Sequence, residues 1–191
     1  MNRVYLLLGS NIGDRAKILA NACTLLSARL LPSIVSVKEC FNKEIKADDA
    51  EVVSDSMVLE VLMPMFVISN IEETEPWGFE SDDKFLNMAV SCKTLYNPHE
   101  VLRICQDIER ELGRNREAEG ERYNERGERI YHSRLIDIDI LFFEHYSYGK
   151  GYRVVNVNDP DLEIPHPKLP ERPFAQRLLQ DVIVKENKNH N

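Results

Sequence analysis

The sequence lacks the features that mark secreted, membrane-spanning and nucleic-acid-binding proteins. Its four cysteines are widely spaced and form no Cys-x-x-Cys pair: Cys23, Cys40, Cys92 and Cys105. This spacing favours a reduced, cytoplasmic protein over a zinc site or a disulfide scaffold. No apolar run approaches ~18 residues, and Met1-Asn2-Arg3 leads directly into a short apolar segment, so we expect neither a membrane span nor a signal peptide. The net charge of −8 argues against nucleic acid or an anionic membrane as a partner.

The order of the expected elements indicates the fold. A chain of 191 residues with 43% hydrophobic content can bury one sizeable core, and we expect a single domain over residues 1–184 with a polar tail at 185–191. The patterns predict a strand at 4–8, a helix between Asp14 and Pro32, a hairpin-like run at 57–67, a strand at 85–95, a helix between Asn97 and Gly113, a strand through 136–143, and a short last helix from about Phe174. This order predicts an α+β, ferredoxin-like βαββαβ sandwich with two helices on one face of the sheet. A polar excursion at 42–65, interpreted as an insertion, would add to an edge.

The most informative segment is the strand at residues 134–143, Arg-Leu-Ile-Asp-Ile-Asp-Ile-Leu-Phe-Phe. It alternates through Ile140, so Asp137 and Asp139 should share one face, roughly 7 Å apart at Cα. Two carboxylates that close repel each other unless a cation lies between them, and removing one should relieve that repulsion. Hard oxygen ligands at this spacing suit Mg²⁺, singly or as a pair that also holds substrate phosphates. A surface strand with two solvated aspartates is the alternative.

An arginine-dense segment precedes this strand. Eight of the fourteen arginines lie between Arg103 and Arg134, where there is no lysine. A guanidinium fork makes two parallel hydrogen bonds to a phosphate and stays charged, although a solvated, ion-paired loop would show the same composition. We take Arg114, Arg116 and Arg134 as candidates for chemistry. The others, which lie among glutamates, are interpreted as loop solvation: Arg122, Arg126 and Arg129 beside Glu119, Glu121, Glu125 and Glu128. We expect the loop arginines to lack partners, and the loop to be mobile, until a triphosphate binds.

Six short motifs occur in order between Val4 and about Leu179. They are Gly9-Ser10-Asn11, Thr74-Glu75-Pro76-Trp77-Gly78, Phe85-Leu86-Asn87, Gln106-x-x-Glu109 followed by Gly113-Arg114-x-Arg116, Arg134-x-x-Asp137-x-Asp139-Ile140, and Pro165-His166-Pro167-x-x-x-x-Arg172-x-Phe174. Together they resemble the 6-hydroxymethyl-7,8-dihydropterin pyrophosphokinase family. The resemblance implies a ferredoxin-like fold and transfer of pyrophosphate from MgATP to the hydroxymethyl group of the pterin. The products would be AMP and the pterin diphosphate of folate biosynthesis.

The resemblance also implies roles for individual residues. Those expected to act in catalysis are Arg116, Arg134, Asp137 and Asp139, of which Asp137 and Asp139 hold two Mg²⁺ ions. Those expected to bind ATP are Gln106, Glu109, Arg114, Arg134, Ile140, His166 and Arg172. Those expected to bind the pterin are Thr74, Pro76, Trp77, Phe85, Asn87 and Phe174. Residues 114–134 correspond to the catalytic loop, which is longer here than is usual in the family. Ile130-Tyr131 stands where the family commonly has arginine followed by tryptophan.

Some of these residues have structural alternatives. Phe85 and Phe174 could be ordinary core residues, and Trp77 could pin its loop in place of lining a pocket. The glycines at 9–13 are interpreted as a structural turn, because no Gly-Lys-Ser/Thr follows them. At the level of the whole chain, a non-catalytic ferredoxin-like domain that binds a regulatory small molecule is the main alternative. An RNA-binding module would need basic charge that this chain lacks. The expected partners are ATP and hydroxymethyl-dihydropterin, with no nucleic acid or membrane, and the enzyme should be a monomer.

Overall fold

The computed structural model describes residues 1–31, 65–77, 82–116, 119, 132–147 and 149–188. Its elements are β1 (Asn2–Ser10), α1 (Arg15–Leu30), β2 (Phe66–Ile68), β3 (Glu72–Thr74), β4 (Phe85–Thr94), α4 (Pro98–Glu111), β5 (Asp137–Ser147), β6 (Gly151–Val154), β7 (Val157–Asp159), β8 (Leu162–Ile164) and α5 (Pro173–Lys188). The excursion predicted at 42–65 lies outside the described residues, except for its last one. Of the hairpin-like run predicted at 57–67, the structure describes residues 65–67, and residues 66 and 67 belong to β2.

The sheet is antiparallel, with strand order β2-β4-β1-β5-β6, and β3 also pairs with β4. The central strand β1 is buried along Val4–Leu8 because its residues are apolar on both faces. The predicted caps are present: Asp14 accepts from the Lys17 N–H, and Asn97 and Glu100 form a capping box at α4. The order β1-α1-(β2, β3)-β4-α4-β5 confirms the ferredoxin-like prediction. No described helix is long and apolar enough to cross a bilayer.

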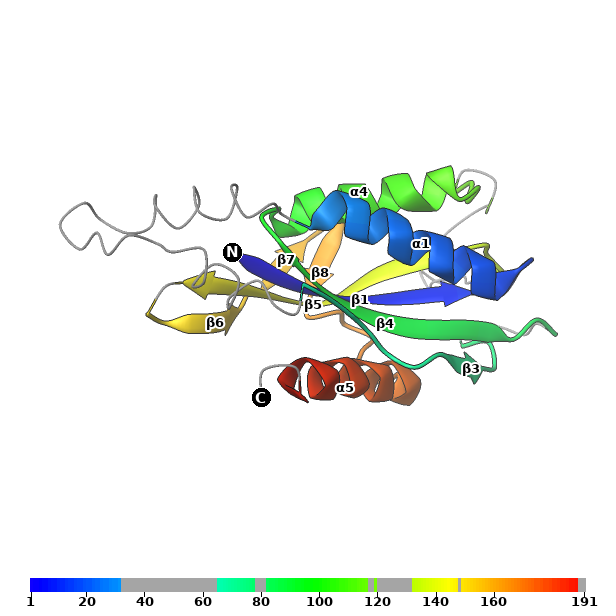
Figure 1. The fold of residues 1–191 in the computed structure, drawn as a ribbon. Helices are drawn as coiled ribbons and strands as arrows, with labels where there is room; N and C mark the ends of the chain where they lie inside the picture. Colours follow the sequence, from blue (N-terminus) through cyan, green and yellow to red (C-terminus); the bar gives the residue numbers. More distant parts are fainter. Residues whose placement is uncertain (32–64, 78–81, 117–118, 120–131, 148, 189–191) are drawn as a thin grey trace.

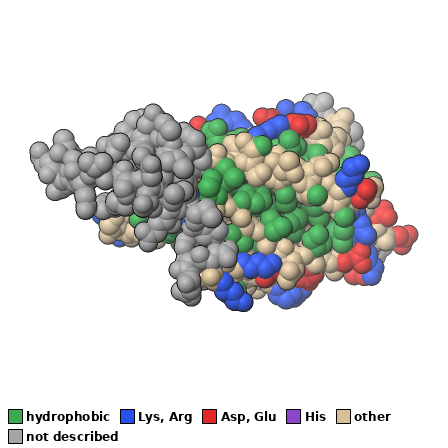
Figure 2. Space-filling view, viewed as in Figure 1, with side chains coloured by type: hydrophobic (Ala, Val, Ile, Leu, Met, Phe, Trp, Pro, Cys, Tyr) green, Lys and Arg blue, Asp and Glu red, His purple; other side chains and the backbone are tan. Residues whose placement is uncertain are grey.

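Two helices lie on one face of the sheet, as predicted, and the last helix lies on the other face. Helices α1 and α4 pack on one face, and α5 packs on the other (Figure 1). The last helix is also longer than predicted, because it runs to Lys188 and includes part of the expected polar tail. Glu186, within that tail, is 2% exposed. Figure 2 shows hydrophobic side chains across the middle of the described surface in this view, with charged side chains along its edges.

An irregularity in β5 decides which way its aspartates point. Tyr5 is paired with Phe142, but Leu6 is paired with Ile140, so Leu141 is an extra residue, a β-bulge. Both Leu141 and Phe142 therefore pack with the α5-side core. Before the bulge, Asp137 and Asp139 share the α5 face, while Ile138 and Ile140 enter the α1/α4 core. The unbroken apolar run that ends the predicted strand is explained by this bulge together with burial on both faces.

Candidate active site

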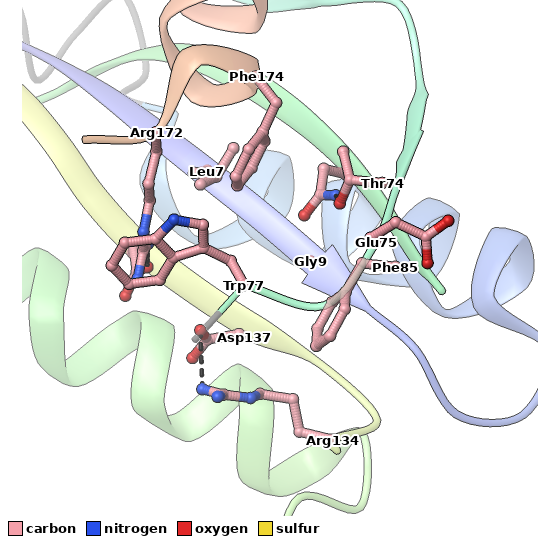
Figure 3. A pocket seen from close by; sticks show the side chains of 12 residues that line it. Leu7, Gly9, Thr74, Glu75, Trp77, Phe85, Arg134, Asp137, Arg172 and Phe174 are labelled. Atoms are coloured by element: carbon pink, nitrogen blue, oxygen red, sulfur yellow. Dashed lines mark hydrogen bonds and ion pairs between the residues drawn. The ribbon is translucent and has the colours of Figure 1, made fainter. Parts of the chain in front are cut away.

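A cavity opens on the α5 face of the sheet, where β1 ends (Figure 3). One row of paired strand positions crosses it: Asn87 of β4, Gly9 of β1 and Asp137 of β5. The other walls come from the segment after β3 and from the start of α5. The lining residues are Leu7, Gly9, Thr74, Glu75, Trp77, Phe85, Asn87, Arg134, Asp137, Asp139, Arg172 and Phe174.

Five of the six residues expected to bind the pterin line this cavity, namely Thr74, Trp77, Phe85, Asn87 and Phe174. The sixth, Pro76, does not line it. Leu7, Gly9 and Glu75 also line it but were not singled out as site residues. For Leu7 and Gly9, the signal was available in the alternation of β1, since both lie opposite the β5 carboxylates across the register.

Gly9 is glycine because of a close approach within the cavity. A Cβ at this position would lie 3.0 Å from Asn87 Oδ1 and 3.6 Å from Phe85 Cδ1. The sequence interpretation of this motif as a structural turn missed that contact. An added methyl group would displace the Asn87 amide, which is the polar group at the floor of the cavity.

We expect Gly9→Ala to weaken pterin binding by roughly tenfold, about the worth of one displaced hydrogen bond. Calorimetric titration of the pterin in the presence of a non-hydrolysable ATP analogue measures this loss. Ser10→Ala is the matched control, because the Ser10 hydroxyl is buried with no hydrogen-bond partner among the described residues. Equal losses in the two variants would contradict the assignment of Gly9 to the cavity.

Asn11, in the same motif, fixes the start of the Arg134 segment. Its Oδ1 accepts from the Arg134 N–H at 2.7 Å, and its Nδ2 donates to Ser133 Oγ at 2.9 Å. Asn11 is itself buried. The turn after β1 is thus structural, as predicted, and its structural task is to place Arg134 beside β5.

Trp77 lies against an arginine at the cavity wall. Its ring centroid is 4.7 Å from the guanidinium carbon of Arg172, a cation–π contact. Arg172 also donates from Nη1 to Asp139 Oδ2 at 3.1 Å. Trp77 therefore both lines the cavity and holds its own segment against Arg172, so the two sequence alternatives coexist.

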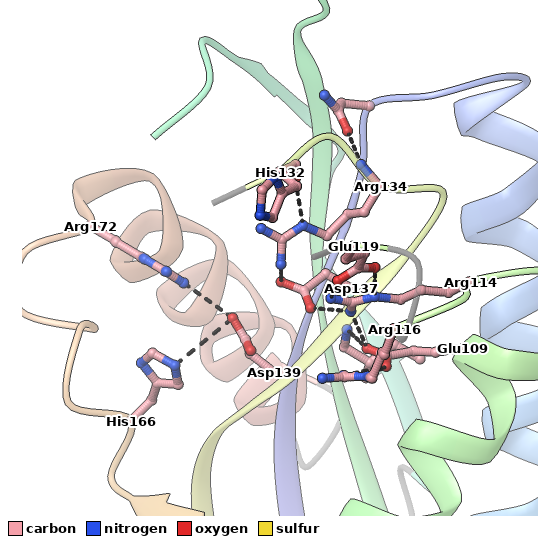
Figure 4. Close-up of polar contacts among 12 residues, drawn as sticks. Glu109, Arg114, Arg116, Glu119, His132, Arg134, Asp137, Asp139, His166 and Arg172 are labelled. Carbon is pink, nitrogen blue, oxygen red and sulfur yellow. Dashed lines mark hydrogen bonds and ion pairs between the residues drawn. The ribbon is translucent and has the colours of Figure 1, made fainter. Parts of the chain in front are cut away.

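Asp137 is enclosed by two arginines (Figure 4). Its Oδ1 accepts from Arg114 Nη1 at 2.6 Å and its Oδ2 from Arg134 Nη1 at 3.0 Å. Burial alone would raise the pKa of this carboxyl, but Arg134 and Arg114 outweigh it and hold the pKa well below its usual range. Asp139 contacts Arg172 and lies 3.9 Å from His166 Nε2, both through Oδ2. The expectation that the unliganded aspartates repel each other is wrong, because each is paired with cationic groups.

Glu109 pairs with Arg114, one of these two arginines, and also with Arg116. Its Oε1 accepts from Arg114 Nη1 at 2.9 Å and from the Ile138 N–H at 2.8 Å, and its Oε2 accepts from Arg116 Nε at 2.9 Å. The side chain is 1% exposed. Glu109 is buried among guanidinium groups, whereas Gln106, three residues before it on α4, is half-buried.

The described arginines of the catalytic loop, Arg114, Arg116 and Arg134, have partners without a triphosphate, which corrects the expectation that they lack them. Arg114 pairs with Asp137, with Glu109 and, through Nε at 2.6 Å, with Glu119. Glu119, interpreted as loop solvation, is therefore part of the cluster. Arg116 pairs with Glu109. Most of the remaining loop, including Arg122, Arg126, Arg129 and Ile130-Tyr131, lies outside the described residues.

A groove of about 810 Å³ adjoins the cavity on the other side of β5. It collects five residues that the sequence assigned to ATP or catalysis: Gln106, Arg116, Asp139, Ile140 and His166. Its outer wall is the β7–β8 hairpin with its turn, from Asp159 to Glu163, and its near wall includes His99, Leu102 and Arg103 of α4. The sequence missed these walls, because short polar strands such as β7 carry little periodic signal. Arg134 and Arg172 line the first cavity instead, and Glu109 and Arg114 line a third space at the end of α4.

Asp139 borders both the cavity and the groove. No other residue that lines the described part of the groove also lines the cavity. In the described part of the chain, no three His, Cys, Asp or Glu side chains gather as a metal-binding group. A molecule in the cavity and a second one in the groove would therefore meet at this carboxylate.

Comparison with known proteins identifies the family. Residues 46–184 match the sequence model of the 7,8-dihydro-6-hydroxymethylpterin-pyrophosphokinase family. A curated 2-amino-4-hydroxy-6-hydroxymethyldihydropteridine pyrophosphokinase of Porphyromonas gingivalis is 36% identical over 179 residues, which cover 94% of this chain and 89% of that protein. The Bacillus subtilis protein of the same name is 32% identical over 181 residues, which cover 95% and 78%.

A solved structure of Plasmodium falciparum HPPK-DHPS is also similar, at 16% identity and a TM-score of 0.45. This chain spans 41% of the length of that chain. With a TM-score below 0.5, that likeness carries no weight, and the assignment rests on the sequence relatives. By the family match and by both relatives, the chain belongs to the 7,8-dihydro-6-hydroxymethylpterin-pyrophosphokinase family.

Proposed function

We propose that the pterin binds in the cavity, that ATP binds in the groove, and that their reacting groups meet at Asp139. The enzyme transfers pyrophosphate from ATP to the hydroxymethyl group of 6-hydroxymethyl-7,8-dihydropterin, giving AMP and the pterin diphosphate, in folate biosynthesis. The observation that carries the proposal is that Asp139 borders both spaces. Transfer of this kind depends mainly on positioning and on neutralising charge.

The cavity suits a flat, polar heterocycle. Phe85 and Phe174 supply aromatic faces, and stacking against such faces favours a planar ring. Asn87 supplies polar atoms at the floor, where its Nδ2 donates to Thr74 Oγ1 at 2.9 Å. Because Asn87 is 4% exposed, a pterin that pairs with it gains a desolvated hydrogen bond.

Asp137 and Asp139 fit the requirements of Mg²⁺. They present carboxylate oxygens from alternate positions of one strand face, and Mg²⁺ needs only one or two such ligands when waters and phosphates complete its octahedron. Their present partners are cations, which indicates a site that holds positive charge next to these carboxylates. When bound, the ions would neutralise the triphosphate and orient the attacking hydroxyl.

In this proposal the arginines that pair with the aspartates also bind the phosphates of ATP. Arg114, Arg134 and Arg172 now neutralise the two aspartates, and MgATP would bring both a cation for the carboxylates and phosphates for the guanidinium groups. Exchange of partners conserves the number of charge-assisted pairs, so little energy is needed to rearrange the site. Arg116 and His166, which line the groove, are suited to contact the phosphates from the other side.

The direct test is release of AMP from ATP on addition of 6-hydroxymethyl-7,8-dihydropterin, with and without Mg²⁺. We expect AMP and pterin diphosphate in equal amounts, only when both substrates and Mg²⁺ are present. A protein that binds the pterin without releasing AMP would contradict the proposed arrangement.

We expect Asn87→Ala to weaken pterin binding by roughly 1–3 kcal/mol, the cost of leaving buried polar groups unpaired. The affinity for an ATP analogue, titrated separately, should stay unchanged because Asn87 does not line the groove. Asn2→Ala is a control outside the cavity, where the side chain donates to the Tyr96 carbonyl at 2.7 Å. Equal loss of pterin and nucleotide affinity in Asn87→Ala would point to a folding defect instead of a lost contact.

We also propose that the enzyme acts in the cytoplasm as a monomeric single domain. Cys23, Cys92 and Cys105 are free thiols, as expected in a reducing compartment. Light scattering of the purified protein at working concentrations measures the mass that this proposal requires.

A further inference from the structure

Helix α5 forms one wall of the cavity with its first turn. Arg172 directly precedes the helix and pairs with Asp139, and Phe174 in its first turn lines the cavity. Any shift of α5 along the sheet therefore moves both groups relative to the pterin and to the β5 carboxylates.

The same helix holds the opposite wall. Three residues spaced four apart on α5 bind the segment that leads into the cavity from β2 and β3. Asp181 Oδ2 accepts from the Asn70 N–H at 2.7 Å, Lys185 Nζ donates to the Ile68 carbonyl at 3.2 Å, and Arg177 pairs with Glu72. Strand β3 ends at Thr74 and is followed by Glu75 and Trp77, and all three residues line the cavity. The distance between the two walls is thus set by where α5 lies.

The contacts that hold α5 on the sheet are mostly apolar. Ala175, Leu178 and Val182 form its buried stripe against Tyr5, Leu7, Val67, Ala89 and Leu141. Burial of this kind stabilises the helix but is non-directional, so it defines the position along the helix axis only loosely. The polar contacts of Arg177, Asp181 and Lys185 go to the segment 68–72 at the edge of the sheet, so fixing the helix against the central strands needs a further directional contact.

Glu186 supplies that contact at the next position of the stripe. It is 2% exposed, and its carboxylate accepts from Tyr5 Oη at 2.9 Å and Ser91 Oγ at 2.5 Å, with Arg3 Nη1 at 3.5 Å. These partners belong to β1 and β4, the strands that also carry Gly9 and Asn87. A buried carboxylate costs desolvation where an apolar residue would not, so its presence favours a role in specifying position.

We infer that Glu186 is a positioning residue for the reaction, acting through α5 on Phe174 and Arg172 from about 18 Å along the helix. By fixing α5 against β1 and β4, it sets the width of the pterin cavity. This inference rests on the proposed location of the pterin.

The test compares Glu186→Leu with Glu186→Gln. Leucine keeps the burial and the helix propensity but removes the acceptors, whereas glutamine can still hydrogen-bond both hydroxyl groups. We expect Glu186→Leu to raise the KM for the pterin about tenfold or more, since small misplacements near a reacting group are costly. The KM for ATP should rise less than the KM for the pterin, since Arg172 is only one of several groups that would contact the phosphates, and Glu186→Gln should restore most of the pterin KM.

Val182→Ala is the matched control, because it removes apolar contacts from the same stripe without touching the hydrogen bonds. It should lower the melting temperature and leave the pterin KM within about twofold. If Glu186→Leu does not fold, Tyr5→Phe and Ser91→Ala remove the donors one at a time and should each raise the pterin KM.

Two results would overturn the inference: an unchanged pterin KM in the variants that lose the hydrogen bonds, or an equal rise in Val182→Ala. Failure of the proposed pterin site is distinguishable from both, because the natural enzyme and Asn87→Ala would then bind the pterin equally.

Discussion

Replacing Asp139 with alanine is expected to lower kcat by about 10²–10³-fold or more, the usual effect of removing one group that stabilises charge in the transition state. Asp139 is the carboxylate at the boundary of the cavity and the groove, and no other described residue lines both. The loss should appear as AMP release at saturating Mg²⁺, ATP and pterin. The melting temperature of the variant checks that it remains folded.

Asp137→Ala should be equally inactive but less stable than Asp139→Ala. It leaves Arg114 and Arg134, 4% and 8% exposed at their side chains, without one of their carboxylate partners. The cost of such a loss is roughly 1–3 kcal/mol. The sequence alone predicted the opposite sign, a gain in stability from relieved repulsion. Asp107→Ala, an exposed aspartate of α4, is the control and should be near normal. Near-normal Mg²⁺-dependent activity in either β5 variant would contradict the assignment of Asp137 and Asp139 as Mg²⁺ ligands.

Replacing Glu109 with alanine is expected to lower the free energy of unfolding by about 3–5 kcal/mol, as when one partner of a buried ion pair is removed. The change leaves Arg114 without its support from α4 and the Ile138 N–H without its acceptor. Turnover should fall as well, because Arg116 loses the carboxylate that holds it beside the groove. Unfolding in urea measures the first effect and AMP release the second.

Glu111→Ala gives the matched control for Glu109. It lies on the same helix, pairs with Arg29, and is half exposed. A surface pair of this kind is worth about 0–1 kcal/mol, so the two glutamates should differ severalfold in their effect on stability. Similar losses in the two variants would show that Glu109 is no more than a solvated partner of the arginines.

The sequence predicted the floor of the site well because strand alternation and short motifs are local. Asp137, Asp139, Asn87 and Phe85 follow the period of two along β4 and β5, and the register with β1 brings them into one cavity. The fold order followed from the same kind of evidence, from the caps of α1 and α4 and from the apolar core of β1.

What the sequence could not predict depends on contacts between distant segments. The pairing of Arg114 with Glu109, Glu119 and Asp137 cannot be inferred from spacing, since charged residues of either sign look alike when solvated or buried. The length of α5 was underestimated for a related reason. Its apolar stripe ends in Glu186, and a charged residue at a core position interrupts the pattern by which a helix is recognised.

The bulge at Leu141 has a consequence for how this sequence can vary. Successive side chains of a strand point to opposite faces of the sheet, so one extra residue changes whether odd or even positions point to a given face. In β5, odd-numbered Asp137 and Asp139 lie opposite Gly9 and Leu7 before the bulge, and even-numbered Phe142 lies opposite Tyr5 after it. Deleting Leu141 would close the bulge and leave Phe142 opposite Tyr5 and Ile140 opposite Leu6, so Asp137 and Asp139 would keep their face. If Leu141 instead took the place opposite Leu6 in a regular strand, both aspartates would turn inward, toward the apolar core beneath α1 and α4. Substitution along β5 changes one contact at a time, whereas one residue inserted between Asp139 and Leu141 would exchange the chemistry of the site with the interior of the protein.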